Sequence, residues 1–223
     1  SLDGLVKLWQ VDGGQEIRTL QGHEKRVCCL TFSPDGSLLA SGGDKAIVWD
    51  VRTFQEATAF RAHESQRINA VRFSPDGSVL AVASNSGHVL LVASRDWQVF
   101  RTLEHDDEVW AVDFSPDGRT LATGDKSGNL RVWSIAAGQP LAVRRGHLGY
   151  VRAVRFTRDG RTLASGGDDH RIRLWDPVEV TEICSLDGHA DGIYTLAFSP
   201  DDGVLASGSY DGAIRFWHAE RSD

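Results

Sequence analysis

Residues 151–176 read VRAVRF, TRDG, RTLASGG, DDH and RIRLWD in succession. Three runs rich in β-branched and apolar residues alternate with short runs of turn-forming residues, which is the pattern of consecutive β-strands joined by tight turns. A fourth strand-like run, VTEICSL, follows at 180–186. The stretch therefore predicts four antiparallel strands between residues 151 and 186.

The same stretch recurs along the whole chain. A histidine precedes each copy, and these histidines are spaced 40, 42, 42 and 42 residues apart, at His23, His63, His105, His147 and His189. Tryptophans follow the same spacing at Trp9, Trp49, Trp133, Trp175 and Trp217, and Val92 stands where a sixth would be. A period in the low forties indicates stacked copies of one supersecondary unit. We expect the copies at residues 1–20 (partial), 23–60, 63–103, 105–145, 147–186 and 189–217.

Two local signals support this division. The turn after the first strand reads Ser-Pro-Asp-Gly at 33–36 and recurs at 74–77 and 115–118. Ser, Pro and Gly suit a type I turn at these positions, so the aspartates are turn formers and not catalytic acids. The apolar residues of the first strand are spaced three and then two positions apart, as at Val151, Val154 and Phe156. One extra residue, a β-bulge, would restore the strict alternation of a strand, so this spacing predicts a bulge.

Composition argues against several functions. The net charge of −7 favours neither nucleic acid nor an anionic membrane as a partner. The longest apolar runs are too short to span a bilayer, and the three cysteines form no disulfide framework. Phosphate-binding glycine motifs and metal-ligand spacings are absent from the sequence, so we expect no cofactor and no metal. These features favour a cytoplasmic location with reduced thiols.

In combination, the Gly-His, Ser-Pro-Asp-Gly, Leu-Ala-Ser-Gly and Ile-Arg-Leu-Trp-Asp motifs resemble the WD-repeat β-propeller family over the whole chain. The excess of arginine over lysine and the near-uniform repeats resemble WD-repeat regions of bacterial multidomain proteins, and the chain resembles the C-terminal part of such a protein. The resemblance implies an all-β propeller with four-stranded antiparallel blades: five nearly complete blades and an N-terminal half blade. It also implies a hydrogen-bonded brace of His, Ser or Thr, Asp and Trp inside each blade. The fully matching sets are His147, Ser165, Asp169 and Trp175, and His189, Ser207, Asp211 and Trp217.

Three blades depart from this pattern. In the first blade the turn before Trp49 is shortened, which places Asp44 five residues ahead of the tryptophan instead of six. Ser127 replaces the aspartate in the third blade, and we expect incomplete braces in both. The second blade keeps His63 but carries Val82, Ser86 and Val92 at the other three positions, so we expect apolar packing to hold it.

The strand count predicts 2 + 16 + 3, or 21 strands. Seven-bladed propellers are common in the resembled family and need 28 strands. We therefore expect residues 1–223 to be a single propeller region and a fragment of a longer, seven-bladed propeller. Its open edges would be completed by upstream strands or would lead to self-association.

The resemblance also implies where a partner would bind. In this family the rim formed by the turns before the first strand and after the second commonly binds peptides and proteins. Trp, Tyr and Arg, the residue types that dominate binding hot spots, occupy this rim. The candidate residues are Arg26, Arg67, Trp110, Tyr150, Arg152, Tyr194 and Tyr210. Because guanidinium groups match carboxylates and phosphates, an acidic or phosphorylated partner is one hypothesis.

We therefore predict a non-catalytic scaffold or sensor domain, in the setting of a signalling protein. Two alternatives stay open: an architectural segment without its own ligand, or an enzyme with a site at the central channel. Trp110 and Tyr194 could also simply line that channel. The repeated Ser, His and Asp residues resemble a hydrolase triad, but their recurrence in successive repeats indicates a structural role.

Overall fold

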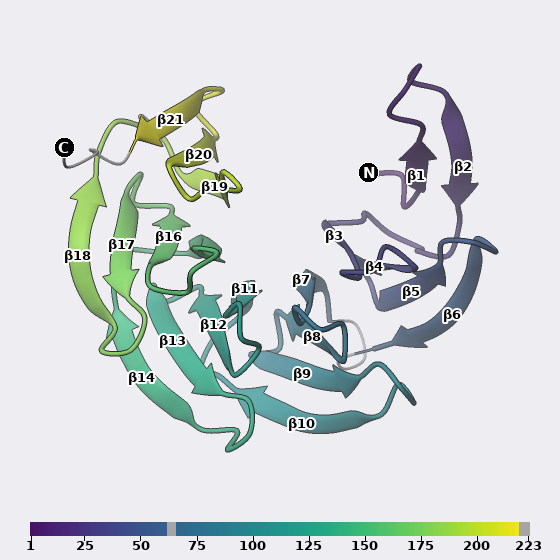
Figure 1. The fold of residues 1–223 in the computed structure, drawn as a ribbon, viewed down its shortest axis with the longest axis horizontal. Coiled ribbons are helices and arrows are strands. Elements are labelled where there is room, and N and C mark those ends of the chain that lie inside the picture. The colour runs from purple at the N-terminus through teal and green to yellow at the C-terminus, as the bar shows by residue number, and fades with distance from the viewer. Residues whose placement is uncertain (62–65, 219–223) are drawn as a thin grey trace. The chain divides into compact units, whose positions relative to one another are not determined.

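The computed structural model describes residues 1–61 and 66–218, and all of their regular structure is β-strand (Figure 1). The described strands form six sheets, in each of which neighbouring strands are consecutive in the chain and antiparallel. Residues 1–104 and residues 105–223 form two compact units.

The first unit contains a half blade and two complete blades. The half blade pairs β1 (Val6–Trp9) with β2 (Glu16–Leu20). The first complete blade consists of β3 (Cys29–Phe32), β4 (Leu38–Gly42), β5 (Ala46–Asp50) and β6 (Gln55–Phe60). The second consists of β7 (Ile68–Phe73), β8 (Val79–Ser84), β9 (His88–Ala93) and β10 (Val99–Glu104).

The second unit contains two complete blades and a three-stranded one. The complete blades are β11 (Val109–Phe114), β12 (Thr120–Asp125), β13 (Asn129–Ser134) and β14 (Pro140–Arg145), and then β15 (Val151–Phe156), β16 (Leu163–Gly167), β17 (Ile172–Asp176) and β18 (Thr181–Leu186). The last sheet consists of β19 (Ile193–Phe198), β20 (Val204–Ser209) and β21 (Ile214–His218). The predicted all-β architecture of five blades and a half blade is confirmed.

The predicted turns and bulges lie where the sequence signals them. In the first turn, Gly36 N–H donates to Ser33 O at 2.9 Å, and the Ser33 hydroxyl donates to Asp35 at 2.6 Å. Hydrogen bonds from Ser33 and Ser37 lower the pKa of Asp35 to about 2, so it is a charged turn residue. In β15 the pairing register shifts between Val151 and Ala153, and β7, β11 and β19 shift at the equivalent place.

Neighbouring blades pack closely where the second strand of one blade carries a glycine. A Cβ atom built on Gly166 in β16 would lie 2.6 Å from Ile193 Cγ2 in β19 of the next blade. The same contact occurs between Gly124 and Val151, at 2.5 Å, and between Gly42 and Ile68, at 2.7 Å. Only the absence of a side chain lets the β-branched residue approach this closely. At these three junctions the glycine therefore sets the distance between consecutive blades.

We predict that Gly166→Ala lowers the free energy of unfolding by about 1–3 kcal/mol, the usual range for an overpacked core. The added methyl group cannot fit without moving Ile193 or its strand. Chemical denaturation followed by circular dichroism measures the change.

Gly208→Ala is the matched control, because among the described residues only Thr195 Cγ2 of the same blade, at 3.1 Å, lies within 4 Å of its built Cβ. An equal loss in both variants would contradict the role of the contact between blades.

Candidate functional site

The two braces that match fully in sequence are present as hydrogen-bonded chains. His189 Nδ1 lies 2.8 Å from Asp211, His189 Nε2 lies 2.8 Å from Ser207 Oγ, and the Trp217 indole donates to Ser207 Oγ at 2.9 Å. In the preceding blade the corresponding distances among His147, Asp169, Ser165 and Trp175 are 2.8, 2.7 and 2.8 Å.

The chemistry of the groups decides which atom donates and which accepts in each hydrogen bond of the brace. A carboxylate can only accept, so Nδ1–H of His189 donates to Asp211 and leaves Nε2 as an acceptor. The Ser207 hydroxyl then donates to Nε2 and accepts from Trp217. Each polar atom on the path thereby has a partner, which removes the cost of burying it.

The braces also keep their carboxylates charged. Burial alone would raise the pKa of Asp169, but its hydrogen bonds with His147 and Arg173 hold that pKa well below its ordinary range. The N–H groups of Ala190 and Ala213 and the His189 hydrogen bond lower the pKa of Asp211 in the same sense. Burial lowers the pKa of His23 in the first blade, so that ring is neutral at pH 7.

The first blade keeps its brace, and the third blade replaces part of it. The shortened turn still brings Asp44 to 3.1 Å from His23, so the prediction of an incomplete brace is wrong for that link. The shortening instead affects Asp44 Oδ2, which is buried without a hydrogen-bond partner in the described region. In the third blade His105 and Trp133 both bond Thr123, and Ser127 donates to Asp107.

The second blade has a different interior. Val82 and Val92 are fully buried in an apolar cluster that includes Ile68 and Phe73. Ser86 bonds Ser84 at 2.7 Å and the His88 ring at 3.0 Å, and so takes part in another polar group. His63 lies outside the described residues.

The rim candidates divide between the two units. Arg26 and Arg67 belong to residues 1–104, where Arg67 Nε donates to Asn69 at 2.9 Å. The five aromatic and arginine candidates that remain all belong to residues 105–223: Trp110, Tyr150, Arg152, Tyr194 and Tyr210. The structure brings these five together in two adjacent groups.

Arg152 is the centre of the first group. Its guanidinium carbon lies 4.6 Å from the Trp110 ring centroid and 4.2 Å from that of Tyr150. The two rings themselves meet edge to face, with centroids 5.2 Å apart. Each ring attracts the cation through its negatively polarised face.

Carboxylates complete this group. Asp168 binds Arg152 through both oxygens, at 2.7 and 3.0 Å, and Glu108 binds Lys126 at 2.8 Å and the Trp110 indole at 3.1 Å. Burial would lower the pKa of Arg152, but Asp168 raises it, and Glu108 likewise raises the pKa of Lys126. We call this charge-balanced set the rim cluster; it consists of Glu108, Trp110, Lys126, Tyr150, Arg152 and Asp168.

Tyr194 and Tyr210 form the second group, an edge-to-face pair with centroids 5.0 Å apart. Both rings are exposed. Burial and the neighbouring Tyr194 raise the pKa of Tyr210. Gly192 joins this pair to the rim cluster, because a Cβ built on it would lie 3.2 Å from Asp168 Oδ1 and 3.5 Å from Tyr210 Cδ2.

Asp168 and Lys126 were missed by the sequence reasoning, although a signal for them existed. The candidate Tyr210 directly precedes the brace residue Asp211. Asp168 precedes Asp169 in the same way, and Lys126 precedes Ser127. The same repeat position therefore supplies a rim residue in all three blades of the second unit.

Other kinds of site find no support in the described part of the chain. No group of three or more His, Cys, Asp or Glu side chains is arranged to hold a metal ion there. No helix in residues 1–61 and 66–218 has the length and apolar character to cross a bilayer. Within those ranges Cys28, Cys29 and Cys184 are free thiols.

Comparison with known proteins gives one consistent family match. The family model described as WD domain, G-beta repeat matches residues 14–50, 54–96, 97–134, 138–176 and 180–218. Each of the last four segments begins just before an outer strand and ends at or shortly after the end of the third strand of the next blade, as 54–96 runs from β6 to β9. The sequence repeat and the structural blade are thus out of phase by one strand.

Matches to individual proteins are short. The chain is 48% identical over 48 residues to the Periodic tryptophan protein 2 homolog of Schizosaccharomyces pombe, which covers 21% of this chain and 6% of that protein. It is 35% identical over 71 residues to the Nuclear distribution protein PAC1 of Komagataella phaffii (29% and 14%). It is 41% identical over 54 residues to the WD repeat and SOCS box-containing protein 1 of Danio rerio (23% and 13%). The chain thus spans a small part of each relative.

We predict that Ser165→Ala lowers the free energy of unfolding by about 1–3 kcal/mol, because it leaves His147 Nε2 and the Trp175 indole without their shared partner. Thermal and urea unfolding measure the loss. Ser165→Thr is the control, since Thr123 fills the same position in its own blade at 2.8 Å from His105. A Thr variant as unstable as the Ala variant would argue against the hydroxyl as the cause.

The brace carboxylates predict a loss of stability in acid. The folded pKa of Asp169 is lower than its unfolded value of about 3.9, so the interaction contributes fully above that pH and is lost as pH falls below it. Asp169→Asn should be less stable at pH 7 and should lose less on acidification. Urea unfolding between neutral pH and pH 3 tests this, and parallel pH curves for the two proteins would refute it.

Proposed function

The chain belongs to the WD40-repeat family, and we propose that it is a non-catalytic scaffold that holds a peptide or protein partner on the rim cluster and the adjoining tyrosine pair. Repeats of this family generally mediate protein–protein interactions, and their homologues are typically non-enzymatic. We further propose a cytoplasmic setting within a signalling assembly, which cell fractionation of the natural protein would test.

The observation that carries the proposal is the fixed geometry of Arg152. Two aromatic rings and a bidentate carboxylate hold this side chain before any partner arrives. A preordered anchor loses little conformational entropy on binding, and Trp, Tyr and Arg supply much of the energy at protein interfaces. The exposed Tyr194 and Tyr210 extend this surface.

An acidic or phosphorylated partner remains a prediction, and it fits Arg152 less well than the sequence implied. Asp168 already accepts from two donors of its guanidinium, so an incoming carboxylate or phosphate would compete with this internal ion pair. Replacement of Arg26, Arg67 and Arg152 by Ser without weaker capture of the partner would refute this preference.

We predict that replacing Trp110 and Tyr194 together by Ala weakens partner binding about tenfold or more, which is the usual cost of removing hot-spot aromatics. Peptides selected from a random display library on the parent chain serve as probes, and calorimetry measures their affinity for each variant. The composition of the selected peptides also tests the acidic preference.

Val178→Ser is the control. This exposed residue lies in the turn between β17 and β18, at the end of the blade opposite the rim. Binders that ignore the double substitution, in a protein whose thermal unfolding is unchanged, would favour the architectural alternative.

A further inference from the structure

An apolar recess of about 330 Å³ lies in the second unit, between the blade of β11 to β14 and the blade of β15 to β18. It is lined by the turns that follow β11, β15 and β17, at the opposite end of the strands from the rim cluster. Its apolar walls are Pro116, Leu141, Phe156, Pro177 and Val178. We call it the turn recess.

A small side chain explains why space is left at this junction. The residue five positions after the repeat's tryptophan position has a positive φ of 59° at Phe54, 58° at Trp97 and 49° at Val180. Phe54 and Trp97 pack against the apolar clusters of their own blades in the first unit. Val180 belongs to the cluster that contains Phe156. Because valine is smaller than either aromatic ring, it fills less of the junction and leaves room beside Phe156.

Exposed apolar side chains stand at the mouth of the turn recess. Leu141 is 60% exposed and Val178 is 77% exposed. The pairing register of β14 shifts at Leu141, between its partners Val132 and Trp133 on β13. Bulges of this kind re-aim a side chain, and here Leu141 lines the recess. Covering these side chains with a ligand would remove apolar surface from water, which favours binding.

Two turn carboxylates, Asp117 and Asp159, also line the turn recess. They belong to the turn after β11 and the turn after β15. These two turns touch, because a Cβ built on Gly160 would lie 3.2 Å from Pro116 Cδ. The recess therefore combines an apolar wall with two acidic side chains from adjacent turns.

One oxygen of each carboxylate is used inside its own turn. Asp117 Oδ1 accepts from the Ser115 hydroxyl at 2.6 Å, and Asp159 Oδ1 accepts from the Thr157 hydroxyl at 2.7 Å. The Ser115 hydrogen bond lowers the pKa of Asp117, and hydrogen bonds from the Arg161 N–H and Thr157 lower the pKa of Asp159. Both side chains are thus negatively charged at neutral pH.

The second oxygen of each carboxylate remains open to a competing cation. Asp117 Oδ2 lies 4.0 Å from Arg119 Nε, and Asp159 Oδ2 lies 4.0 Å from Arg161 Nε. The two arginine side chains are 86% and 87% exposed. Ion pairs this exposed contribute little free energy, so a cation held beside the recess by apolar contacts can replace them.

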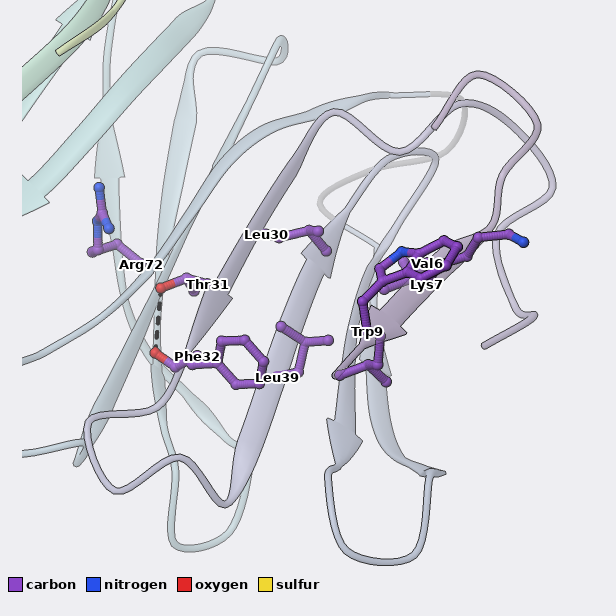
Figure 2. Close-up of a pocket in the computed structure, with 9 residues that line it drawn as sticks. Val6, Lys7, Trp9, Leu30, Thr31, Phe32, Leu39 and Arg72 are labelled. Carbon is purple, nitrogen blue, oxygen red and sulfur yellow. Dashed lines mark hydrogen bonds between the residues drawn. The ribbon is translucent and has the colours of Figure 1, made fainter. Parts of the chain in front are cut away.

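The larger recess of the first unit carries the opposite charge. This space of about 520 Å³ lies between β1 and β3, with Trp9 on one side and Phe32 on the other (Figure 2). Its charged lining residues are Lys7 and Arg72. The acidic lining is therefore particular to the turn recess and gives it a distinct ligand preference.

We propose that the turn recess binds a basic peptide segment of a partner protein, in which an apolar residue lies between two arginine or lysine residues. The apolar side chain packs against Leu141 and Phe156, and the cations contact the second oxygens of Asp117 and Asp159. The net charge of −7 adds long-range attraction for such a segment. This binding is independent of the rim cluster, which lies at the other end of the same blades.

The probe is the acetylated and amidated peptide Arg-Gly-Leu-Gly-Arg, whose three side chains point to one side when it is extended. Titrated into the chain labelled with ¹⁵N, it should shift the amide resonances of Asp117, Leu141 and Gly160 and leave those of Trp110 and Tyr194 in place. Its affinity should fall as salt is added, because exposed charges are screened. The matched peptides Glu-Gly-Leu-Gly-Glu and Arg-Gly-Ser-Gly-Arg should both bind more weakly.

Leu141→Ser should weaken binding of the probe about tenfold, because it removes an apolar side chain from the buried surface. Val143→Ser is the matched control, since Val143 lies on the same strand and is 40% exposed but does not line the recess. Val178→Ser, which is the control for the rim cluster, should weaken the probe as well. The two sites are thereby told apart.

Asp117→Asn combined with Asp159→Asn should weaken the probe about fivefold, since each exposed ion pair contributes little, and should remove most of the salt dependence. Asp76→Asn is the control, because Asp76 holds the same turn position in the first unit and does not line the recess. The salt dependence and the glutamate peptide test the charge on the unmodified chain, so the test does not depend on how well the Asn variants fold.

Four outcomes would overturn the proposal. Equal binding of the glutamate peptide, or unchanged affinity in the double Asn variant, would show an apolar recess without a preference for charge. Unchanged affinity in Leu141→Ser would show that the peptide does not use the recess. Shifts confined to Trp110, Tyr150 and Tyr194 would assign the peptide to the rim cluster. An absence of shifts at Leu141 up to the solubility limit of the probe would show that the recess does not bind it.

Discussion

Each four-stranded sheet of this protein has two apolar faces and can bury them only against other sheets. At three junctions the contact that makes this possible is small: a glycine on the second strand accepts a β-branched side chain from the first strand of the next blade, as Gly166 accepts Ile193. The bulge in the first strand, which aims that side chain, and the brace, which fixes the second strand behind it, both support this contact. Where no strand of the described residues covers them, as at Leu30, the same apolar side chains face solvent.

The brace and the rim are two sides of one turn. Asp169 points inward and accepts from His147, and Asp168, its neighbour in sequence, points outward and holds Arg152. Asp211 and Tyr210 have the same two roles, since Asp211 bonds His189 and Tyr210 meets Tyr194 edge to face. A rigid interior thus places the rim side chains without the loops themselves having to be rigid. This coupling lets the rim vary in chemistry while its geometry is kept.

Sequence reasoning predicted what depends on neighbours along one strand or one turn. The strands, the Ser-Pro-Asp-Gly turns and the bulges follow from local pattern, and the residues of the braces follow from the resemblance to the WD-repeat family. It could not predict the capture of Arg152 by Asp168, because that pair depends on how two turns come together in space. It also missed the hydrogen bond between Asp44 and His23, since a shortened turn can follow a different path and still place its carboxylate at the same point.

The offset between sequence repeat and blade has a consequence for how such a chain can grow. Because the segment 138–176 supplies β14 to one blade and β15 to β17 to the next, no repeat is a finished sheet by itself. Duplicating one such segment inserts a blade whose outer strand comes from the copy that follows, and both old junctions are reproduced unchanged. Length can therefore change in whole repeats by recombination without inventing a new packing surface.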